Sequence, residues 1–141
     1  MTFQTKIIEI KTTLLTKETP VDVKHLTESN GIFVSIPYFQ INAINVHLHC
    51  SNRSIRLRQL ESLLPNIPKE RCILGGDFND RTERFSLRDF LSCSKALGPT
   101  TIYGSCIDDI LYTPDVKIES PKVVRKRFGL MDHYPIIATV V

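Results

Sequence analysis

The sequence lacks the features that define several classes of protein. None of its four cysteines belongs to a C-x-x-C pair, so we expect no zinc site. No apolar stretch approaches the ~20 residues that a membrane span requires, and residues 1–15 contain no continuous hydrophobic segment typical of signal peptides. These absences predict an intracellular, cytoplasmic protein with no membrane span. Cys50 and Cys72 lie in apolar, strand-like runs, and we expect both to be small core residues.

Strong net charge and internal repetition are also absent. The formal net charge is only +3, which permits a polyanionic partner but does not predict one. The chain contains no repeat, low-complexity tract or long linker. Its length of 141 residues corresponds to a single domain over residues 1–141.

The apolar pattern predicts a mixed α/β fold. Alternating or β-branched runs predict strands, and two longer amphipathic stretches predict helices. The expected strands are 6–15, 31–36, 41–50, 71–74, 106–112, 116–124 and 136–141, and the expected helices are 54–64 and 87–97, the second capped by Ser86. On the first helix we expect Leu60 and Leu64 to face the core and Arg56 to face solvent. This order of elements indicates a mixed α/β sandwich and not a helix bundle or a β-barrel.

Four polar clusters interrupt or end these apolar runs. They are Asn45-Val46-His47-Leu48, Gly75-Gly76-Asp77-Phe78-Asn79, Ile107-Asp108-Asp109-Ile110 and Asp132-His133-Tyr134-Pro135. Carboxylates, an amide and imidazoles at the ends of several strands are the groups that metal-assisted phosphate chemistry requires. Their combination predicts such a site more strongly than any single cluster does.

The second cluster offers ligands for magnesium. Residues i and i+2 of an extended segment share a face, so Asp77 and Asn79 should project together. A carboxylate beside an amide suits a hydrated Mg²⁺ ion and a phosphate oxygen, and Asn79 could orient a nucleophilic water. The alternative is an Asx-type turn that merely follows the strand. Gly75 and Gly76 allow a close backbone approach or a bulge.

The third and fourth clusters offer an acid–base pair. His133 follows Asp132, and histidine titrates near neutral pH, although such a pair also fits an ordinary turn. Asp108 lies between apolar residues and is a candidate buried carboxylate, for which an imidazolium is a natural partner. Asp109 should point to the opposite face and be solvated.

The other polar residues are less distinctive. His47 lies on the polar face of its strand near Asn45, whereas His25 and His49 are interpreted as structural or surface residues. The arginines are interpreted as a solvated face or, alternatively, as contacts to a phosphate-bearing substrate. They are Arg53, Arg56, Arg58, Arg125 and Arg127.

Taken in order, the motifs resemble those of the endonuclease/exonuclease/phosphatase superfamily, which has the deoxyribonuclease-I-like fold. Members carry an Asn-x-His-Leu strand end, a helix with Arg and Gln, Gly-Asp-Phe-Asn, Ile-Asp-x-Ile and Ser-Asp-His-x-Pro. Here they read Asn45-Val46-His47-Leu48, Arg58-Gln59, Gly76-Asp77-Phe78-Asn79, Ile107-Asp108-Asp109-Ile110 and Met131-Asp132-His133-Tyr134-Pro135. The resemblance covers residues 30–141 best and implies a deoxyribonuclease-I-like mixed α/β sandwich.

The resemblance also implies a role for each matching residue. His133 looks like the family's base or transition-state stabiliser at the scissile phosphate, oriented by Asp108. Asp77 looks like the residue that holds the attacking water, and Asn79 like its orienting amide. Substrate binding is implied for Asn45, His47 and Asn79, and metal binding for Asp77 and Asp132.

The chain departs from the family pattern as well. Family domains are nearly twice as long, and their first half supplies an Asn and a Gln-Glu whose Glu is the principal Mg²⁺ ligand. Neither is recognisable here, and Glu9, the nearest candidate, is not assigned that role. Met131 replaces the usual Ser, and Asp109 stands where a large or aromatic residue is usual. We therefore expect a truncated, C-terminal portion of the domain that binds Mg²⁺, or Mn²⁺, weakly.

Three hypotheses follow from these expectations. The first is a Mg²⁺-dependent phosphoesterase, most of all a nuclease, with nucleic acid favoured over phospholipid or nucleotide. The second is a non-catalytic remnant or binding module that keeps only the phosphate-contacting face. The third is one half of a split enzyme, in which a partner chain supplies the missing half. Metal-dependent turnover by the isolated chain would favour the first.

Overall fold

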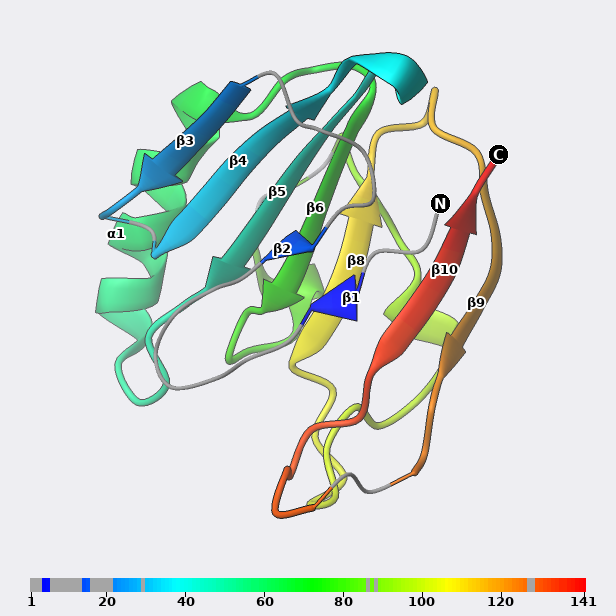
Figure 1. Cartoon of the computed structure of the whole chain (residues 1–141). Coiled ribbons are helices and arrows are strands. Elements are labelled where there is room, and N and C mark those ends of the chain that lie inside the picture. Colours follow the sequence, from blue (N-terminus) through cyan, green and yellow to red (C-terminus); the bar gives the residue numbers. More distant parts are fainter. Residues whose placement is uncertain are drawn as a thin grey trace.

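The computed structural model describes residues 4–5, 14–15, 22–28, 30–85, 87, 89–126 and 129–141. Its main element is a six-stranded sheet of order β3-β4-β5-β6-β8-β7 (Figure 1). These strands are β3 (Asp22–Leu26), β4 (Gly31–Ile36), β5 (Ile41–His47), β6 (Cys72–Asp77), β7 (Leu91–Ser92) and β8 (Asp108–Tyr112). Two further pairs are β1 (Gln4–Thr5) with β2 (Leu14–Leu15), and β9 (Ile118–Val123) with β10 (Ile136–Val140). Helix α1 spans Arg53–Leu63, and 3₁₀ turns span Pro37–Phe39, Leu64–Asn66, Thr82–Arg84 and Ser94–Ala96.

The strand directions bring three chain segments to one edge of the sheet. β5 and β6 are parallel and are joined through α1, so both strands end at this edge, where His47 pairs with Asp77. β8 runs antiparallel to β6 and therefore begins there, with Asp108 opposite Asp77. The topology alone thus gathers the polar ends of β5 and β6 and the polar start of β8.

Helix α1 covers one face of the sheet. It begins after Asn52, whose side-chain oxygen accepts a hydrogen bond from the Ile55 N–H, as expected for an N-cap. Its buried residues Leu60 and Leu63 belong to the main core. The sheet and the following loop contribute Ile44, Val46, Leu48, Cys72, Leu74, Phe78, Phe85 and Leu111 to the same core. Ile44, Val46 and Leu48, which alternate along the chain, therefore share one buried face.

The opposite side of the sheet carries a second apolar cluster. Ile41, Ile73 and Val116 are buried there, with Ile118 of β9 and Val140 of β10 packed against them. β9 and β10 lie beyond β8 in Figure 1. The chain between β9 and β10 returns to the polar edge, and this segment carries His133.

Gly76 is required by the closeness of β5 and β6. Its φ is +140°, and a Cβ atom there would lie 2.0 Å from the carbonyl oxygen of Val46. No L-residue fits such a position without moving the backbone. The expected close approach is therefore present at Gly76.

Several local predictions were wrong. The helix expected over 87–97 is replaced, within the described residues, by β7 and the Ser94–Ala96 turn, because Leu91 and Ser92 pair with β8. Leu64 is 45% exposed, and Cys50 is exposed rather than in the core. Of the strand expected over 6–15, only Leu14–Leu15 lies in the described residues, and Ser86 lies outside them.

The mixed α/β fold class is confirmed by this arrangement. Within the described part of the chain, no helix is both long and apolar enough to cross a membrane.

Candidate active site

Backbone hydrogen bonds hold the segment that bears His133 at the polar edge of the sheet. The Tyr134 N–H donates to the Thr100 carbonyl at 2.7 Å, and the Ile102 N–H donates to the Asp132 carbonyl at 2.9 Å. The buried Thr100 hydroxyl also accepts hydrogen bonds from the N–H groups of Ile107 and Asp108. The same threonine therefore fixes the start of β8 and the segment that bears His133.

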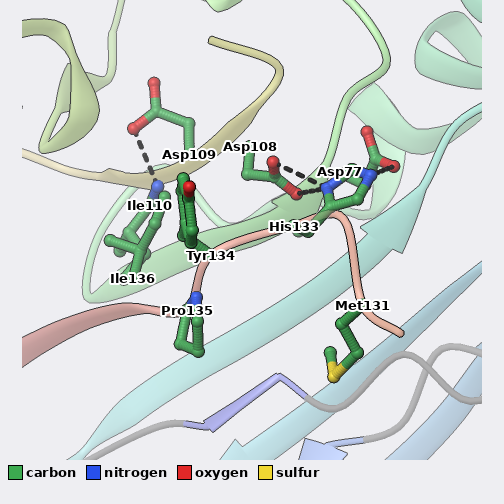
Figure 2. A pocket seen from close by; sticks show the side chains of 10 residues that line it. Asp77, Asp108, Asp109, Ile110, Met131, His133, Tyr134, Pro135 and Ile136 are labelled. Carbon is green, nitrogen blue, oxygen red and sulfur yellow. Dashed lines mark hydrogen bonds and ion pairs between the residues drawn. The ribbon is translucent and has the colours of Figure 1, made fainter. Parts of the chain in front are cut away.

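His133 forms a close pair with Asp108 (Figure 2). Its Nδ1 lies 3.0 Å from Oδ1 and 2.9 Å from Oδ2 of that carboxylate. This hydrogen bond, then the charges of Asp108, Asp77 and Asp132, raise the pKa of His133 to about 9, although burial opposes the shift. The imidazole is therefore a cation at neutral pH, with Nδ1–H donated to Asp108 and Nε2–H directed toward Asp77.

Asp77 is a buried carboxylate at this edge, with 3% of its surface exposed. Its Oδ1 accepts the Asn79 N–H at 2.8 Å, and its Oδ2 lies 3.6 Å from His47 Nε2 and 3.8 Å from His133 Nε2. Burial and then the Asp108 charge raise the pKa of Asp77 to about 6, against the opposing effects of the Asn79 N–H and the two imidazoles. Asp77 is thus ionised at neutral pH but is a much stronger base than an ordinary carboxylate.

The remaining predicted residues surround this centre. Asn79 has a left-handed φ of 51°, and its side-chain amide donates to the Leu48 carbonyl at 2.7 Å. The Asx turn considered as an alternative is therefore present, and it places Asn79 beside Asp77. Asp132 is half exposed, with Oδ1 3.9 Å from His133 Nε2. Asn45 is buried against Gly76, whose Cβ would lie 2.8 Å from Asn45 Oδ1.

The structure thus brings together all the predicted site residues. His47, Asp77, Asn79, Asp108, Asp132 and His133 meet at one edge, and Asn45 lies beneath them in β5. The catalytic and binding roles of these residues stay predictions.

The donor set fits a hard divalent cation. Within the described residues, ligand atoms of Asp77, Asp108 and His133 lie within 4.8 Å of one another. Because both oxygens of Asp108 face the His133 imidazolium, Asp77 is the buried carboxylate that remains for an ion. Oxygen donors from the protein, completed by waters, are what Mg²⁺ prefers.

An apolar wall borders the acidic centre on one side. A pocket of about 60 Å³ lies between β6, β8 and the segment that leads into β10. Figure 2 shows the side chains of Met131, Tyr134, Pro135 and Ile136 along this pocket, with Ile110 beside them. The wall therefore lies on the His133 side of the centre.

Two charged residues were assigned wrongly from the sequence. Asp109 does point away from Asp108, but it is only 2% exposed instead of solvated. It accepts hydrogen bonds from the Thr82 and Ser92 hydroxyls, both at 2.7 Å, and from the Ser94 N–H at 3.0 Å. These donors stabilise the buried carboxylate and attach the β7 segment to β8.

Arg56 was also expected in solvent but is 8% exposed. Its guanidinium donates to the carbonyls of His49 and Cys50, at 3.0 and 3.1 Å, and lies 3.3 Å from Asp80 Oδ2. The sequence interpretation did not single out Asp80. A usable signal was the spacing of Arg56 from Leu60 and Leu63, which puts all three on one helix face. His49 has the expected structural role, because its Nδ1 accepts from the Ser51 and Asn52 N–H groups.

Solved structures share this fold. A functionally unknown conserved protein from Enterococcus faecalis V583 matches with a TM-score of 0.70 and 15% identity, over 91% of this chain and 69% of that one. The endonuclease domain of TRAS1, a telomere-specific non-LTR retrotransposon, matches with a TM-score of 0.68 and 16% identity, over 99% and 77%. A mannosyl-6-phosphatase from Bacteroides thetaiotaomicron VPI-5482 matches with a TM-score of 0.59 and 18% identity, over 79% and 55%. At these identities the matches establish the fold alone.

The sequence itself gives the family. No curated protein sequence matches the chain significantly. The Endonuclease/Exonuclease/phosphatase family matches residues 10–127, a range that includes Asp77 and Asp108 and ends before His133. Because this match covers most of the chain and the fold agrees with it, the chain belongs to the Endonuclease/Exonuclease/phosphatase family.

Proposed function

We propose that this protein hydrolyses phosphate esters by metal-assisted attack of water on phosphorus, with nucleic-acid phosphodiesters as the preferred substrate. The observation that carries the proposal is the buried Asp77 carboxylate, which faces His47 on one side and an Asp108-bound His133 on the other. A carboxylate and two imidazoles thus converge at one edge of the sheet.

Asp77 acts as the group that holds and deprotonates the attacking water. A general base is most effective when its pKa lies near the working pH, and the pKa of Asp77 is raised to about 6. Asn79 fixes the position of this carboxylate through its backbone N–H. The water therefore has one preferred oxygen, Oδ2, on the side that faces the imidazoles.

His133 stabilises the charge that develops on the phosphate oxygens. Since the Nδ1–H of His133 is donated to Asp108, the Nε2–H is the donor that remains for a substrate. An imidazolium that is fixed in position stabilises an oxyanion more strongly than freely reorienting water does. His47 Nε2, on the other side of Asp77, provides a second donor.

Asp77 and Asp132 are the residues that would hold a hydrated Mg²⁺ or Mn²⁺ ion. When bound, such an ion supplies charge neutralisation at the phosphate oxygens and orients the substrate. Two of the proteins that share the fold are named as an endonuclease and a phosphatase, and both names denote enzymes that act on phosphate esters. This supports phosphate esters as the substrate class without selecting one member of it.

A substrate panel tests the proposal. The purified chain is incubated with abasic DNA, RNA, a phosphoinositide and a simple phosphodiester, in Mg²⁺, Mn²⁺ or EDTA. We expect metal-dependent hydrolysis that His133→Ala lowers at least about a hundredfold. His25→Ala, which removes an exposed imidazole of β3, is the matched control and should keep the wild-type rate. Hydrolysis that persists in His133→Ala, or none on any substrate, would overturn the proposal.

A further inference from the structure

A second, polar hollow adjoins the acidic centre. It has a volume of about 410 Å³ and lies between residues 79–84, which follow β6, and residues 104–107, which precede β8. Arg56 of α1 also lines it. The two loops are joined where the Phe78 N–H donates to the Ile107 carbonyl at 2.8 Å. We call this hollow the arginine groove.

The groove is adjacent to the proposed reaction centre. Asn79 lines the groove and donates its N–H to Asp77, while Ile107 lines the groove and precedes Asp108. A strand whose phosphate lies at Asp77 and His133 therefore meets this groove with its neighbouring phosphates.

The groove contains three arginines and one carboxylate, which pairs with two of them. Asp80 pairs with Arg56 at 3.3 Å and with Arg84 at 2.9 Å. The Arg81 side chain, which is exposed, has no hydrogen-bond or ion-pair partner among the described residues. The groove thus carries an excess of two positive charges.

The buried part of the groove is fixed, and its outer part is open to a ligand. Asp80 holds Arg56 in place, yet the buried Arg56 Nε–H has no acceptor among the residues that the structure describes. The Arg84 side chain is 62% exposed. Arg56 therefore holds Asp80 in position, whereas Arg81 and Arg84 keep donors available for a phosphate oxygen.

We propose that the arginine groove binds the phosphodiester backbone of a nucleic-acid strand next to the bond that is cut. This inference rests on the proposed function and specifies its substrate: a phosphomonoester ends at the reaction centre, whereas a polymer continues into the groove. Arg81 and Arg84 contact backbone phosphates and read no base, so binding is insensitive to sequence.

Binding of fluorescein-labelled oligonucleotides tests the proposal. Anisotropy is measured in EDTA with single-stranded and duplex DNA and with single-stranded RNA, over a range of salt concentrations. Arg81→Ala combined with Arg84→Ala should weaken binding about tenfold and reduce the salt slope by about 1.4 for single strands and about 1.8 for duplexes. Arg81→Glu changes the charge of the groove by the same two units and should also weaken binding, and it keeps the test decisive if the double variant folds poorly.

The matched control removes the same charge elsewhere. Lys69 and Lys117 are exposed and lie near the opposite end of the sheet, before β6 and before β9. Their double alanine variant should bind within about twofold of wild type. Equal losses in both double variants, or tighter and arginine-dependent binding to vesicles of anionic lipid, would overturn the proposal.

The binding assay separates this inference from the proposed function. Arginine-dependent binding by a chain that hydrolyses no substrate would support the groove and refute the proposed function. If the chain hydrolyses nucleic acid but its binding does not depend on Arg81 and Arg84, only the role proposed for the arginine groove would be overturned.

Discussion

Replacing Asp108 with asparagine separates the charge of the Asp108–His133 pair from its shape. Asparagine has nearly the size of aspartate and can still accept a hydrogen bond from His133 Nδ1, but it carries no charge. Both the hydrogen bond to a carboxylate and its negative charge raise the pKa of His133 from 6.5 to about 9. In Asp108→Asn we expect most of this rise to disappear.

The size of the effect follows from the linkage between proton binding and free energy. A fall of about 2.5 pH units corresponds to a loss of about 3 kcal/mol in the preference for the imidazolium form. Because the pKa of His133 is higher in the folded state, its contribution to stability is complete below pH 6.5 and is lost as the pH rises through about 9. The wild-type free energy of unfolding should therefore decrease as the pH is raised from 6.5 to about 9. The free energy of unfolding of Asp108→Asn should change much less over the same range.

NMR titration of the metal-free protein in EDTA measures this pKa directly. The His133 imidazole signals are assigned with His133→Gln and are followed from pH 5 to 10 in wild type and in Asp108→Asn. We expect a midpoint near 9 in wild type and one closer to 6.5 in the variant. A wild-type midpoint below 7, or equal midpoints in the two proteins, would refute the reasoning.

A strained glycine, a buried ion pair and the metal site give the remaining predictions. Gly76→Ala should lower the melting temperature strongly, because its Cβ would lie 2.0 Å from a carbonyl oxygen. Gly75→Ala should leave the melting temperature nearly unchanged, because the nearest atom to its Cβ would be 3.6 Å away. Equal melting temperatures of the two variants would contradict this. Asp80→Asn should lose about 3–5 kcal/mol in urea unfolding, because it leaves the Arg56 guanidinium buried without its carboxylate. Burial opposes ionisation of Asp80, but a backbone N–H and two guanidinium groups outweigh it and hold its pKa below the usual value. Its contribution to stability is therefore present above about pH 4 and lost as the pH falls further, and acid unfolding of Asp80→Asn should lack that loss. Calorimetric titration should show weak Mg²⁺ binding, because no second buried carboxylate among the described residues is free to help Asp77 hold the ion; micromolar affinity would prove this wrong.

The site could be predicted because its residues lie at strand ends. A parallel pair places its carboxyl ends together, and an antiparallel neighbour begins where they end, so the positions of His47, Asp77 and Asp108 follow from topology. The pairing of Asp108 with an imidazole followed from the cost of burying a carboxylate alone.

The environment of Asp109 could not be predicted from its own strand. Alternation correctly placed it on the face opposite Asp108, but on that face Thr82, Ser92 and Ser94 cover its carboxylate and donate hydrogen bonds to it. The expected helix over 87–97 failed for the same reason. Pairing with β8 outweighs the weak helical preference of that segment.

Arg56 shows a different limit. Its helical spacing from Leu60 and Leu63 indicated burial, and its charge indicated solvent. The conflict is resolved by Asp80, which lies in a loop 24 residues later and pairs with it in the folded state. No local pattern gives that contact.

The central claim is that Asp77 activates water for hydrolysis of a phosphodiester. Its most direct test is the rate of Mg²⁺-dependent cleavage of nucleic acid by Asp77→Asn, measured beside wild type at pH 7.5 with the fold checked by circular dichroism. Because asparagine cannot take a proton from water, the rate should fall at least about a hundredfold. A correctly folded Asp77→Asn protein that cleaves at the wild-type rate would contradict the account.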